Sequence, residues 1–201
     1  MSDWPDLLGP VEEVAPRLLG AVLRHGPVAV RLVEVEAYGG SDDPGSHAFR
    51  GPTPRSSIMF GQAGRLYCYL SYGMHVCLNV VVGHEGEAGA VLLRAGEVVD
   101  GHDEVRTRRP GARERDLARG PALLSRALGI DLASNGADLA SGPVRLERRA
   151  STDTAYAAGP RVGLRGAADR PWRFWVPGSP QVSAYRRHPR APDLANQPDV
   201  S

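Results

Sequence analysis

The sequence predicts an α+β fold in one compact domain. Its 201 residues suit a single domain or two small ones, and a hydrophobic content of 42% is enough to fill a core. The expected strands and helices follow one another in a mixed order, without the regular βαβ alternation of parallel folds. No internal repeat or clean linker divides the chain. We therefore expect one domain over residues 1–185 and a flexible tail over residues 186–201.

The first expected elements are a short helix, a strand and a long loop. Pro10 suits the start of a helix that extends to residue 19. Residues 28–38 are an apolar, β-branched run typical of a strand. Residues 39–57 then form a long loop, and loops of that length are usually functional or disordered. The apolar side of the helix would consist of Val11, Val14, Leu18 and Leu19.

A β-hairpin is expected next, over residues 65–83. Two apolar runs, residues 65–71 and 75–83, flank a turn that contains Gly73. A further strand is plausible at 88–95. Residues 119–129 have helical spacing, with Leu123, Leu124 and Leu128 directed inward. Later strands fit residues 144–148, 161–164 and 173–176.

The strand at 28–38 carries two carboxylates and a phenol on one side. Side chains alternate along a strand, so Glu34, Glu36 and Tyr38 share one face. The other face carries Val33, Val35 and Ala37. A solvated face is the ordinary consequence of such alternation. The wall of a catalytic cleft is the alternative, and strand geometry does not distinguish Glu34 from Glu36.

The hairpin tip carries two unusually large side chains. Turn tips favour small or polar residues, yet Tyr72 and Met74 stand here. They could dock onto the body of the protein, or they could act as a wedge, because proteins that distort DNA insert apolar side chains between base steps. A turn centred on Tyr72 and Gly73 would place Cys68 opposite Cys77, but we expect free thiols.

Composition excludes several classes of protein. No apolar run approaches the ~20 residues that span a bilayer, and the N-terminal residues lack signal-peptide character, so we expect a cytoplasmic, nucleoid-associated protein. Two cysteines are too few for a disulfide framework. The grouping of Asp42, Asp43 and His47 matches no recurring metal site, and we expect no metal.

The charge distribution is uneven, and all 24 basic residues are arginine. Residues 1–100 contain 7 Arg and 12 acidic residues, whereas residues 101–201 contain 17 Arg and 11 acidic residues. This asymmetry hints weakly at a polyanionic partner, although a solvated helix face explains the mixed charges at 112–120 equally well. Without lysine, catalysis through an internal amine is excluded.

These features together match the requirements of base flipping. An enzyme that flips a base needs a side chain to fill the gap, aromatic surfaces to hold the base, a polar group to read its edge and a catalyst. Each requirement has a candidate: Tyr72 for the gap, Tyr38, Tyr69 and His47 for the base, Asn79 for its edge, and a carboxylate from the Glu34/Glu36 face.

The chain resembles the alkyladenine (3-methyladenine) DNA glycosylase family over roughly residues 8–184. The resemblance is carried by VEVEAY at 33–38, MF at 59–60, LYCYLSYGMHVCLN at 66–79 and GAVLLRA at 89–95, and it continues through RGPALLSRALGI, RVGL and RFWVPGSPQVS. It implies a curved antiparallel sheet with flanking helices and a protruding hairpin. It also implies hydrolytic excision of alkylated or deaminated purines from double-stranded DNA without a cofactor. We expect a monomer.

The resemblance also implies a role for each site residue. Glu36 would be the general base, and Arg94 would support the catalytic water and a nearby phosphate. Tyr38, His47 and Tyr69 would form the base pocket, whose electron-rich walls would favour cationic purines. Asn79 would disfavour guanine. Tyr72, with Met74, would be the DNA-intercalating wedge.

One departure and two alternatives remain. Relatives often have a lysine where this chain has Leu123, and Arg119 or Arg126 could substitute for it. The absence of lysine predicts a monofunctional enzyme that leaves an intact abasic site. A non-catalytic DNA damage-binding protein would have the same pocket without turnover. A carbohydrate-cleaving enzyme would use Glu34 and Glu36 as an acid/base pair.

Overall fold

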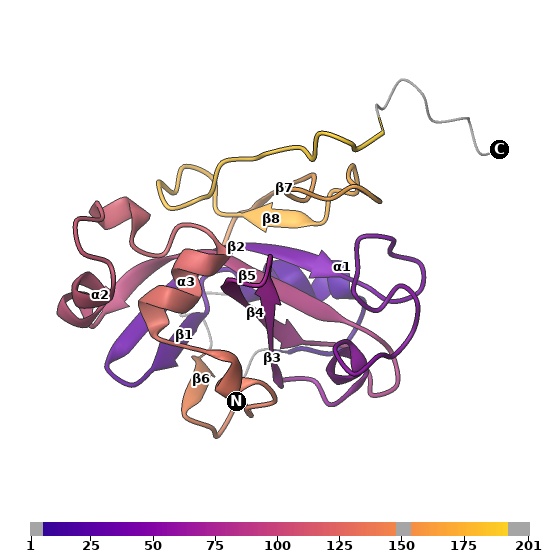
Figure 1. Ribbon diagram of the computed structural model, residues 1–201, viewed down its shortest axis with the longest axis horizontal. Helices are drawn as coiled ribbons and strands as arrows, with labels where there is room; N and C mark the ends of the chain where they lie inside the picture. The colour runs from indigo at the N-terminus through magenta and orange to yellow at the C-terminus, as the bar shows by residue number, and fades with distance from the viewer. Residues whose placement is uncertain (1–5, 148–153, 193–201) are drawn as a thin grey trace.

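The structure is a computed structural model that describes residues 6–147 and 154–192 (Figure 1). Within these residues the strands form one eight-stranded antiparallel sheet in the order β3-β4-β5-β2-β1-β6, with β8 on β2 and β7 on β8. The sheet curls, and the few helices lie around it (Figure 1). The α+β class, the single compact domain and the curved antiparallel sheet are therefore confirmed. The strands are β1 (Val22–His25), β2 (Val28–Tyr38), β3 (Leu66–Ser71), β4 (His75–Val81), β5 (Ala90–Asp100), β6 (Val144–Glu147), β7 (Ala157–Gly159) and β8 (Arg173–Trp175).

The helical elements are short. The N-terminal helix expected over residues 10–19 is divided, because Pro16 has no N–H to continue the α-helical hydrogen bonds. The predicted helix at 119–129 is confirmed as α3, in which Leu124 and Leu128 are buried and Leu123 is partly exposed. The α-helices are α1 (Val11–Val14), α2 (His102–Arg108) and α3 (Pro121–Leu128), and the 3-10 helices are η1 (Ala15–Leu18), η2 (Ser57–Phe60), η3 (Glu114–Asp116) and η4 (Leu132–Ser134).

The long strands β2 and β5 form the centre of the sheet. The bounds of β2 match the prediction, and β5 extends five residues beyond it, to Asp100. One main hydrophobic core joins the apolar sides of α1, η1, α2 and α3 to the strands. Val35 and Ala37 of β2 are fully buried in this core, as the alternation along the strand predicts.

The strand prediction at 161–164 is wrong, since these residues form a turn. Gly163 has a positive φ of 70°, and the buried guanidinium of Arg161 binds Asp43 from a distant loop instead of extending a sheet edge. Two strands and one α-helix, β1, β7 and α2, were not predicted. The first had a local signal, because Gly26 and Pro27 form the two-residue turn between β1 and β2. Residue 148, at the end of the strand expected at 144–148, lies outside the described residues.

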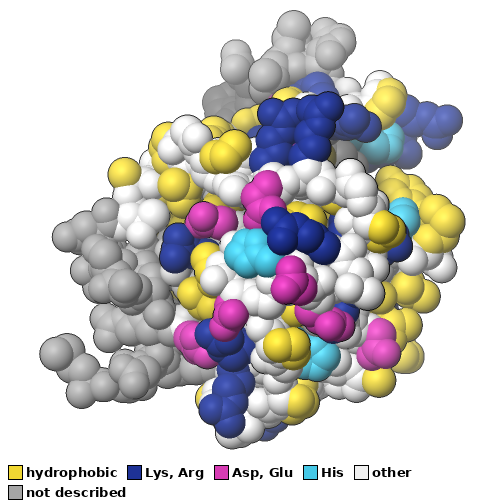
Figure 2. Space-filling model, turned by 90° about the vertical axis from the view of Figure 1, so that its left-hand side faces the viewer, with side chains coloured by type: hydrophobic (Ala, Val, Ile, Leu, Met, Phe, Trp, Pro, Cys, Tyr) yellow, Lys and Arg dark blue, Asp and Glu magenta, His cyan; other side chains and the backbone are white. Residues whose placement is uncertain are grey.

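The surface around α2 carries interspersed arginine and acidic side chains (Figure 2). Arg106 pairs with Glu114, and Arg108 pairs with Glu104. Mutually paired charges fit the solvated-face interpretation of the mixed-charge stretch at 112–120. In the part of the chain that the structure describes, no helix has the length and apolar character needed to cross a membrane.

Candidate active site

The segment after β2 folds over one end of the sheet. As predicted, residues 39–56 form neither helix nor strand, and η2 follows them. Ala48 and Met59 from this segment pack against Tyr67 of β3 and Ala90 of β5 in a second, smaller hydrophobic cluster. The loop is therefore an ordered wall with its own core.

This wall and the sheet enclose a pocket of about 80 Å³. The four predicted base-pocket residues all line it: Tyr38 from the end of β2, His47 from the loop, Tyr69 from β3 and Asn79 from β4. A small pocket with aromatic walls and one amide suits a flat heteroaromatic ring. The remaining lining residues are Gly45, Met59, Tyr67, Ala90 and Leu164.

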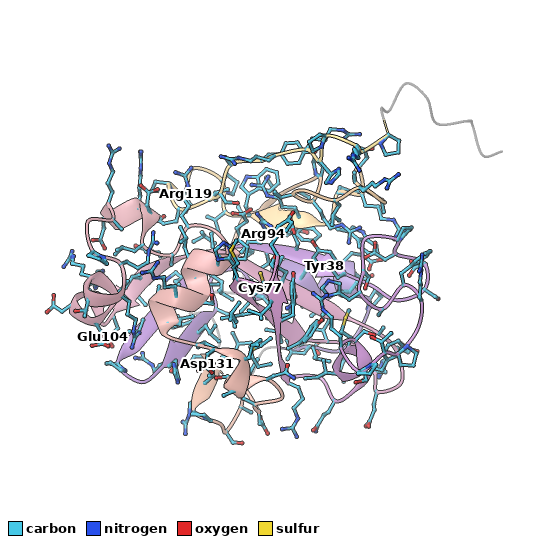
Figure 3. The ribbon with its side chains drawn as sticks, viewed as in Figure 1. Tyr38, Cys77, Arg94, Glu104, Arg119 and Asp131 are labelled. Carbon is cyan, nitrogen blue, oxygen red and sulfur yellow. The ribbon has the colours of Figure 1, made fainter. Side chains whose placement is uncertain are left out.

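The two carboxylates of β2 are fully buried, so the solvated-face interpretation is wrong. Two register shifts in the pairing of β2 with β5, on either side of Glu34, explain the position of these carboxylates. Glu34 pairs with Ala95 and Val35 with Leu93, so that Arg94 is an extra residue on β5. Bulges of this kind redirect a side chain. The Arg94 guanidinium contacts both acids, with Nε 2.8 Å from Glu34 Oε1 and Nη1 3.2 Å from Glu36 Oε2. Figure 3 shows Arg94 and Tyr38 on these neighbouring strands.

Glu34 is held by four hydrogen bonds. Its Oε1 accepts from Arg94 Nε, Arg173 Nε and Ser183 Oγ, each at 2.8 Å, and its Oε2 accepts from the Ser183 amide at 2.6 Å. Burial alone would raise the pKa of Glu34, but the charges of Arg94 and Arg173 and these hydrogen bonds outweigh it and lower the pKa. Glu34 thus accepts four hydrogen bonds, three at Oε1 and one at Oε2.

Glu36 has three donors and so retains one acceptor position. Its Oε2 accepts from Arg94 Nη1 and from the Tyr38 hydroxyl at 2.9 Å, and its Oε1 accepts from the Val162 amide at 2.7 Å. Burial and the Glu36 charge raise the pKa of Tyr38 well above its usual value, which keeps this hydroxyl protonated as a donor. Glu36 is thus the acid linked directly to a pocket wall, through the Tyr38 hydroxyl, and its Oε1 has room for a second hydrogen bond.

The aromatic side of the pocket is held by His47, Tyr67 and Tyr69. His47 Nδ1 lies 3.0 Å from the Tyr67 hydroxyl, and its ring meets Tyr69 edge-on with 4.7 Å between ring centroids. Although the residue as a whole is exposed, its ring packs against these tyrosines. Desolvation, together with the nearby charge of Arg55, lowers the pKa of His47 to about 4. The imidazole is therefore neutral near pH 7.

Asn79 lies opposite Tyr67 in the β3–β4 hairpin and is buried. Its Nδ2 donates to the Tyr67 carbonyl at 3.0 Å. Because this hydrogen bond uses the NH₂ group, it fixes which way the amide faces. The structure therefore brings Asn79 into the pocket as an oriented polar group.

The hairpin tip exposes the two expected large residues. The Tyr72 side chain is 90% exposed and Met74 is 71% exposed, so neither docks onto the body of the protein. Tyr72 also has a positive φ of 51°, which is unusual for a residue other than glycine. Both large side chains thus remain exposed to solvent, although burial would be favourable for them.

The hairpin register differs from the one expected. Ser71 pairs with His75 across a three-residue loop, so Cys77 faces Tyr69 and Cys68 faces Leu78. The proposed Cys68–Cys77 alignment is therefore wrong by one residue. Both cysteines are buried free thiols, as expected.

Sequence reasoning missed an ion pair that supports the pocket. Arg161 and Asp43 are both fully buried, and the two guanidinium nitrogens lie 2.7 and 2.6 Å from the carboxylate oxygens. Arg161 also donates to the Ala37 carbonyl at 2.9 Å and stacks over Tyr38, 4.8 Å from the ring centroid. Nothing in the local sequence links residues 118 positions apart.

Two groups from the sequence analysis lie outside the pocket lining: the Asp43 carboxylate of the weak metal grouping, and the two arginines that could replace the family lysine. Asp43 binds Arg161 and not a metal, and among the described residues no three His, Cys, Asp or Glu side chains could hold a metal ion. Arg119 donates to the Val182 carbonyl at 2.9 Å, beside the C-terminal segment (Figure 3). Arg126 is exposed on α3.

The C-terminal segment completes the site through Ser183 and continues into the expected tail. Arg186 accepts a hydrogen bond at its carbonyl from the Gly163 amide at 2.9 Å, and Arg187 pairs with Asp169. Residues 193–201 lie outside the described residues.

Comparisons with known proteins agree with this geometry. The sequence model described as methylpurine-DNA glycosylase matches residues 6–180. A protein of Nocardia farcinica, named as a candidate 3-methyladenine DNA glycosylase, is 62% identical over 190 residues, which cover 90% of each chain. A protein of the same name from Leifsonia xyli is 58% identical, with 88% of this chain and 89% of the relative covered. A third, from Rhodococcus jostii, is 55% identical, with 89% and 83% covered.

These matches define the class as the DNA glycosylases, which are hydrolases that act on glycosyl bonds of DNA. Within that class, the chain belongs to the methylpurine-DNA glycosylase family. The family predicted from the sequence blocks is confirmed.

Proposed function

We propose that this chain is a monofunctional DNA glycosylase of base excision repair. It would flip a damaged purine out of duplex DNA, hydrolyse the N-glycosidic bond and leave an intact abasic site. Its substrates would be alkylated or deaminated purines of the 3-methyladenine, 7-methylguanine, hypoxanthine and ethenoadenine class. The observation that carries the proposal is the hydrogen bond that joins the Glu36 carboxylate to Tyr38, a wall of the aromatic pocket.

In this mechanism Glu36 is the general base. The sugar becomes oxocarbenium-like as the purine leaves, so a nearby carboxylate stabilises the developing charge and deprotonates the attacking water. Arg94, Tyr38 and the Val162 amide hold the carboxylate in place. Arg94 is itself buried and donates to the two acids and to Ser183, so it positions the carboxylates.

The pocket residues would hold the flipped base. Tyr38 would stack on one face, with His47 and Tyr69 completing the enclosure. Asn79 would crowd the exocyclic amine of guanine and so disfavour it. A neutral His47 can donate one hydrogen bond from whichever ring nitrogen carries the proton, which would assist the departure of a neutral base such as hypoxanthine.

Tyr72 would fill the gap left by the flipped nucleotide, with Met74 beside it. Their exposure on a hairpin tip supports this role, because an exposed apolar side chain can enter a base step without first breaking contacts within the protein. We propose action as a monomer on double-stranded DNA.

The test is single-turnover excision from duplex oligonucleotides that carry one hypoxanthine or one ethenoadenine. Glu36→Gln should slow excision by about a hundred- to ten-thousandfold while DNA binding at low salt is retained. Glu97→Gln, at a partly exposed position of β5, is the matched control and should excise at the wild-type rate. Products should break only after alkaline treatment, as expected of a monofunctional enzyme.

Three results would count against the proposal. If the wild type binds damaged DNA tightly but releases no base, the damage-binding alternative is correct. If Glu34→Gln abolishes excision and Glu36→Gln does not, the roles of the two acids are exchanged. Strand breaks without alkali would contradict the monofunctional mechanism. The carbohydrate-cleaving alternative has little support, because both acids are buried and share one guanidinium.

A further inference from the structure

The buried charges around the pocket compensate one another. Glu34 and Glu36 form one cluster with Arg94 and Arg173, with two negative and two positive charges. Asp43 and Arg161 form a separate pair. His47 is neutral near pH 7 because its pKa is about 4. None of these groups leaves a net charge beside the pocket.

Arg55 is the exception. Its guanidinium carbon lies 4.9 Å from the centroid of the Tyr69 ring, which is a pocket wall. No acidic side chain in residues 6–147 or 154–192 forms an ion pair with it. Arg55 also lowers the pKa of His47 through its charge, which places that charge close to the pocket.

The loop that presents Arg55 is well ordered by its own hydrogen bonds. Ser56 is fully buried; its hydroxyl donates to the Gly51 carbonyl at 3.1 Å and accepts from the Thr53 amide at 2.9 Å. Thr53 Oγ1 in turn accepts from the Ser56 amide at 3.1 Å. A turn closed from both sides holds the intervening Arg55 at a fixed place, so its contact with Tyr69 is part of the fold.

We propose that Arg55 is a specificity-determining residue that biases the pocket toward neutral purines and against cationic ones. This inference rests on the proposed function and deepens it. An aromatic ring attracts a cation through its face. Arg55 already occupies that interaction at Tyr69, and a cationic purine in the pocket meets an uncompensated like charge. Neither effect weakens the binding of a neutral purine such as hypoxanthine.

Arg55 therefore changes the substrate preference that the aromatic walls alone would produce. Without Arg55, the tyrosines would favour a positively charged base such as 7-methylguanine. With Arg55 in place, that advantage is reduced, and neutral deaminated or etheno bases compete on more equal terms. The specificity thus depends on one charge at the rim as well as on the shape of the pocket.

The experiment compares single-turnover excision of 7-methylguanine and of hypoxanthine from otherwise identical duplexes. Arg55→Gln should raise the ratio of the 7-methylguanine rate to the hypoxanthine rate by about two- to fivefold, the factor expected for one exposed cation–π contact. The comparison is between variants, so the different leaving abilities of the two bases cancel. Arg55→Lys keeps the charge and should keep the wild-type ratio.

Arg50→Gln is the matched control, because it removes an exposed arginine from the same loop. It should leave the ratio unchanged. Thermal unfolding of all three variants shows that the fold is retained, as expected for exposed positions. Rates should also be measured at two salt concentrations, because a contact with DNA phosphate weakens as salt rises.

Two outcomes overturn the inference alone. If wild type releases both bases and Arg55→Gln leaves the ratio unchanged, the charge of Arg55 does not select substrates. If Arg55→Gln slows both bases equally and reduces the salt dependence, Arg55 binds phosphate instead. If wild type releases neither base, the proposed function fails and this inference fails with it.

Discussion

Replacing Arg161 with methionine should destabilise the fold strongly, because it leaves a buried carboxylate without its cation. Asp43 and Arg161 are fully buried and joined by two short hydrogen bonds. The variant retains only the Gly39 and Gly45 amides as donors to the Asp43 carboxylate, at 3.0 and 3.1 Å. It also loses the hydrogen bond to the Ala37 carbonyl.

The magnitude follows from these contacts. Breaking a buried pair by removing one partner costs about 3–5 kcal/mol of unfolding free energy. A neighbouring pair offers a matched control, because Arg170 is partly exposed and Asp42 is exposed, with 3.5 Å between Nη1 and Oδ2. Arg170→Met should therefore cost at most about 1 kcal/mol.

The cost should also depend on pH. Burial tends to raise the pKa of Asp43, but Arg161 and the two glycine amides lower it below its usual value. In the wild type this lowered pKa contributes stability above the pKa of the unfolded state, and the contribution is lost as pH falls through the folded pKa. In Arg161→Met, burial without the cation raises the pKa, so that the carboxyl takes up a proton as pH falls. The loss should therefore be larger at about pH 7 than at about pH 4.5.

Urea unfolding followed by circular dichroism at both pH values measures these differences. The double variant Arg161→Met/Asp43→Asn should recover part of the loss, since no buried charge remains. A loss below about 1 kcal/mol at pH 7, or one equal to that of Arg170→Met, would refute the reasoning. A loss that grows as pH falls would contradict the assigned sign.

Three further predictions concern the hairpin, the pocket histidine and the thiols. Tyr72→Gly should leave stability unchanged or raise it by up to about 1 kcal/mol in urea unfolding, since glycine adopts a positive φ without strain; a clear loss would show that the tip is packed. His47 is neutral above about pH 4, so the excision rate should show no break near pH 6.5. A break there that disappears in His47→Gln would contradict the lowered pKa. Burial raises the pKa of Cys68 to about 12 and also raises that of Cys77. Both thiols should therefore react with a disulfide reagent only after unfolding, and rapid labelling of the native protein would contradict their burial.

The local pattern of the sequence was sufficient for much of the sheet. The apolar, β-branched run at 28–38 and the two runs around Gly73 have a period of two, and this period is set by the backbone of the strand itself. For the same reason the buried face of Val35 and Ala37 was predictable. The hairpin register was not, because a loop of two residues and one of three fit the same runs, and the choice moves Cys77 from Cys68 to Tyr69.

The candidate site was predictable as a set of residues but not as an arrangement. The blocks around Glu36, Tyr69 and Asn79 identify the family, and the four predicted base-pocket side chains line one pocket. Periodicity also placed Glu34 and Glu36 on one face. It suggested that this face is solvated, which is wrong because the bulge at Arg94 and a distant C-terminal segment cover both acids.

What the sequence determined by itself is therefore local: the central strands, the hairpin, the identity of the pocket residues and the absence of lysine. Only the tertiary structure decided which carboxylate contacts a pocket wall, since Glu36 binds the Tyr38 hydroxyl while Glu34 binds Ser183, 149 residues away. It alone also placed Arg161 against Asp43 and Arg55 over Tyr69. Hydrogen bonds and ion pairs form between groups that are close in space, and the periodicity of the sequence does not show which distant residues come into contact.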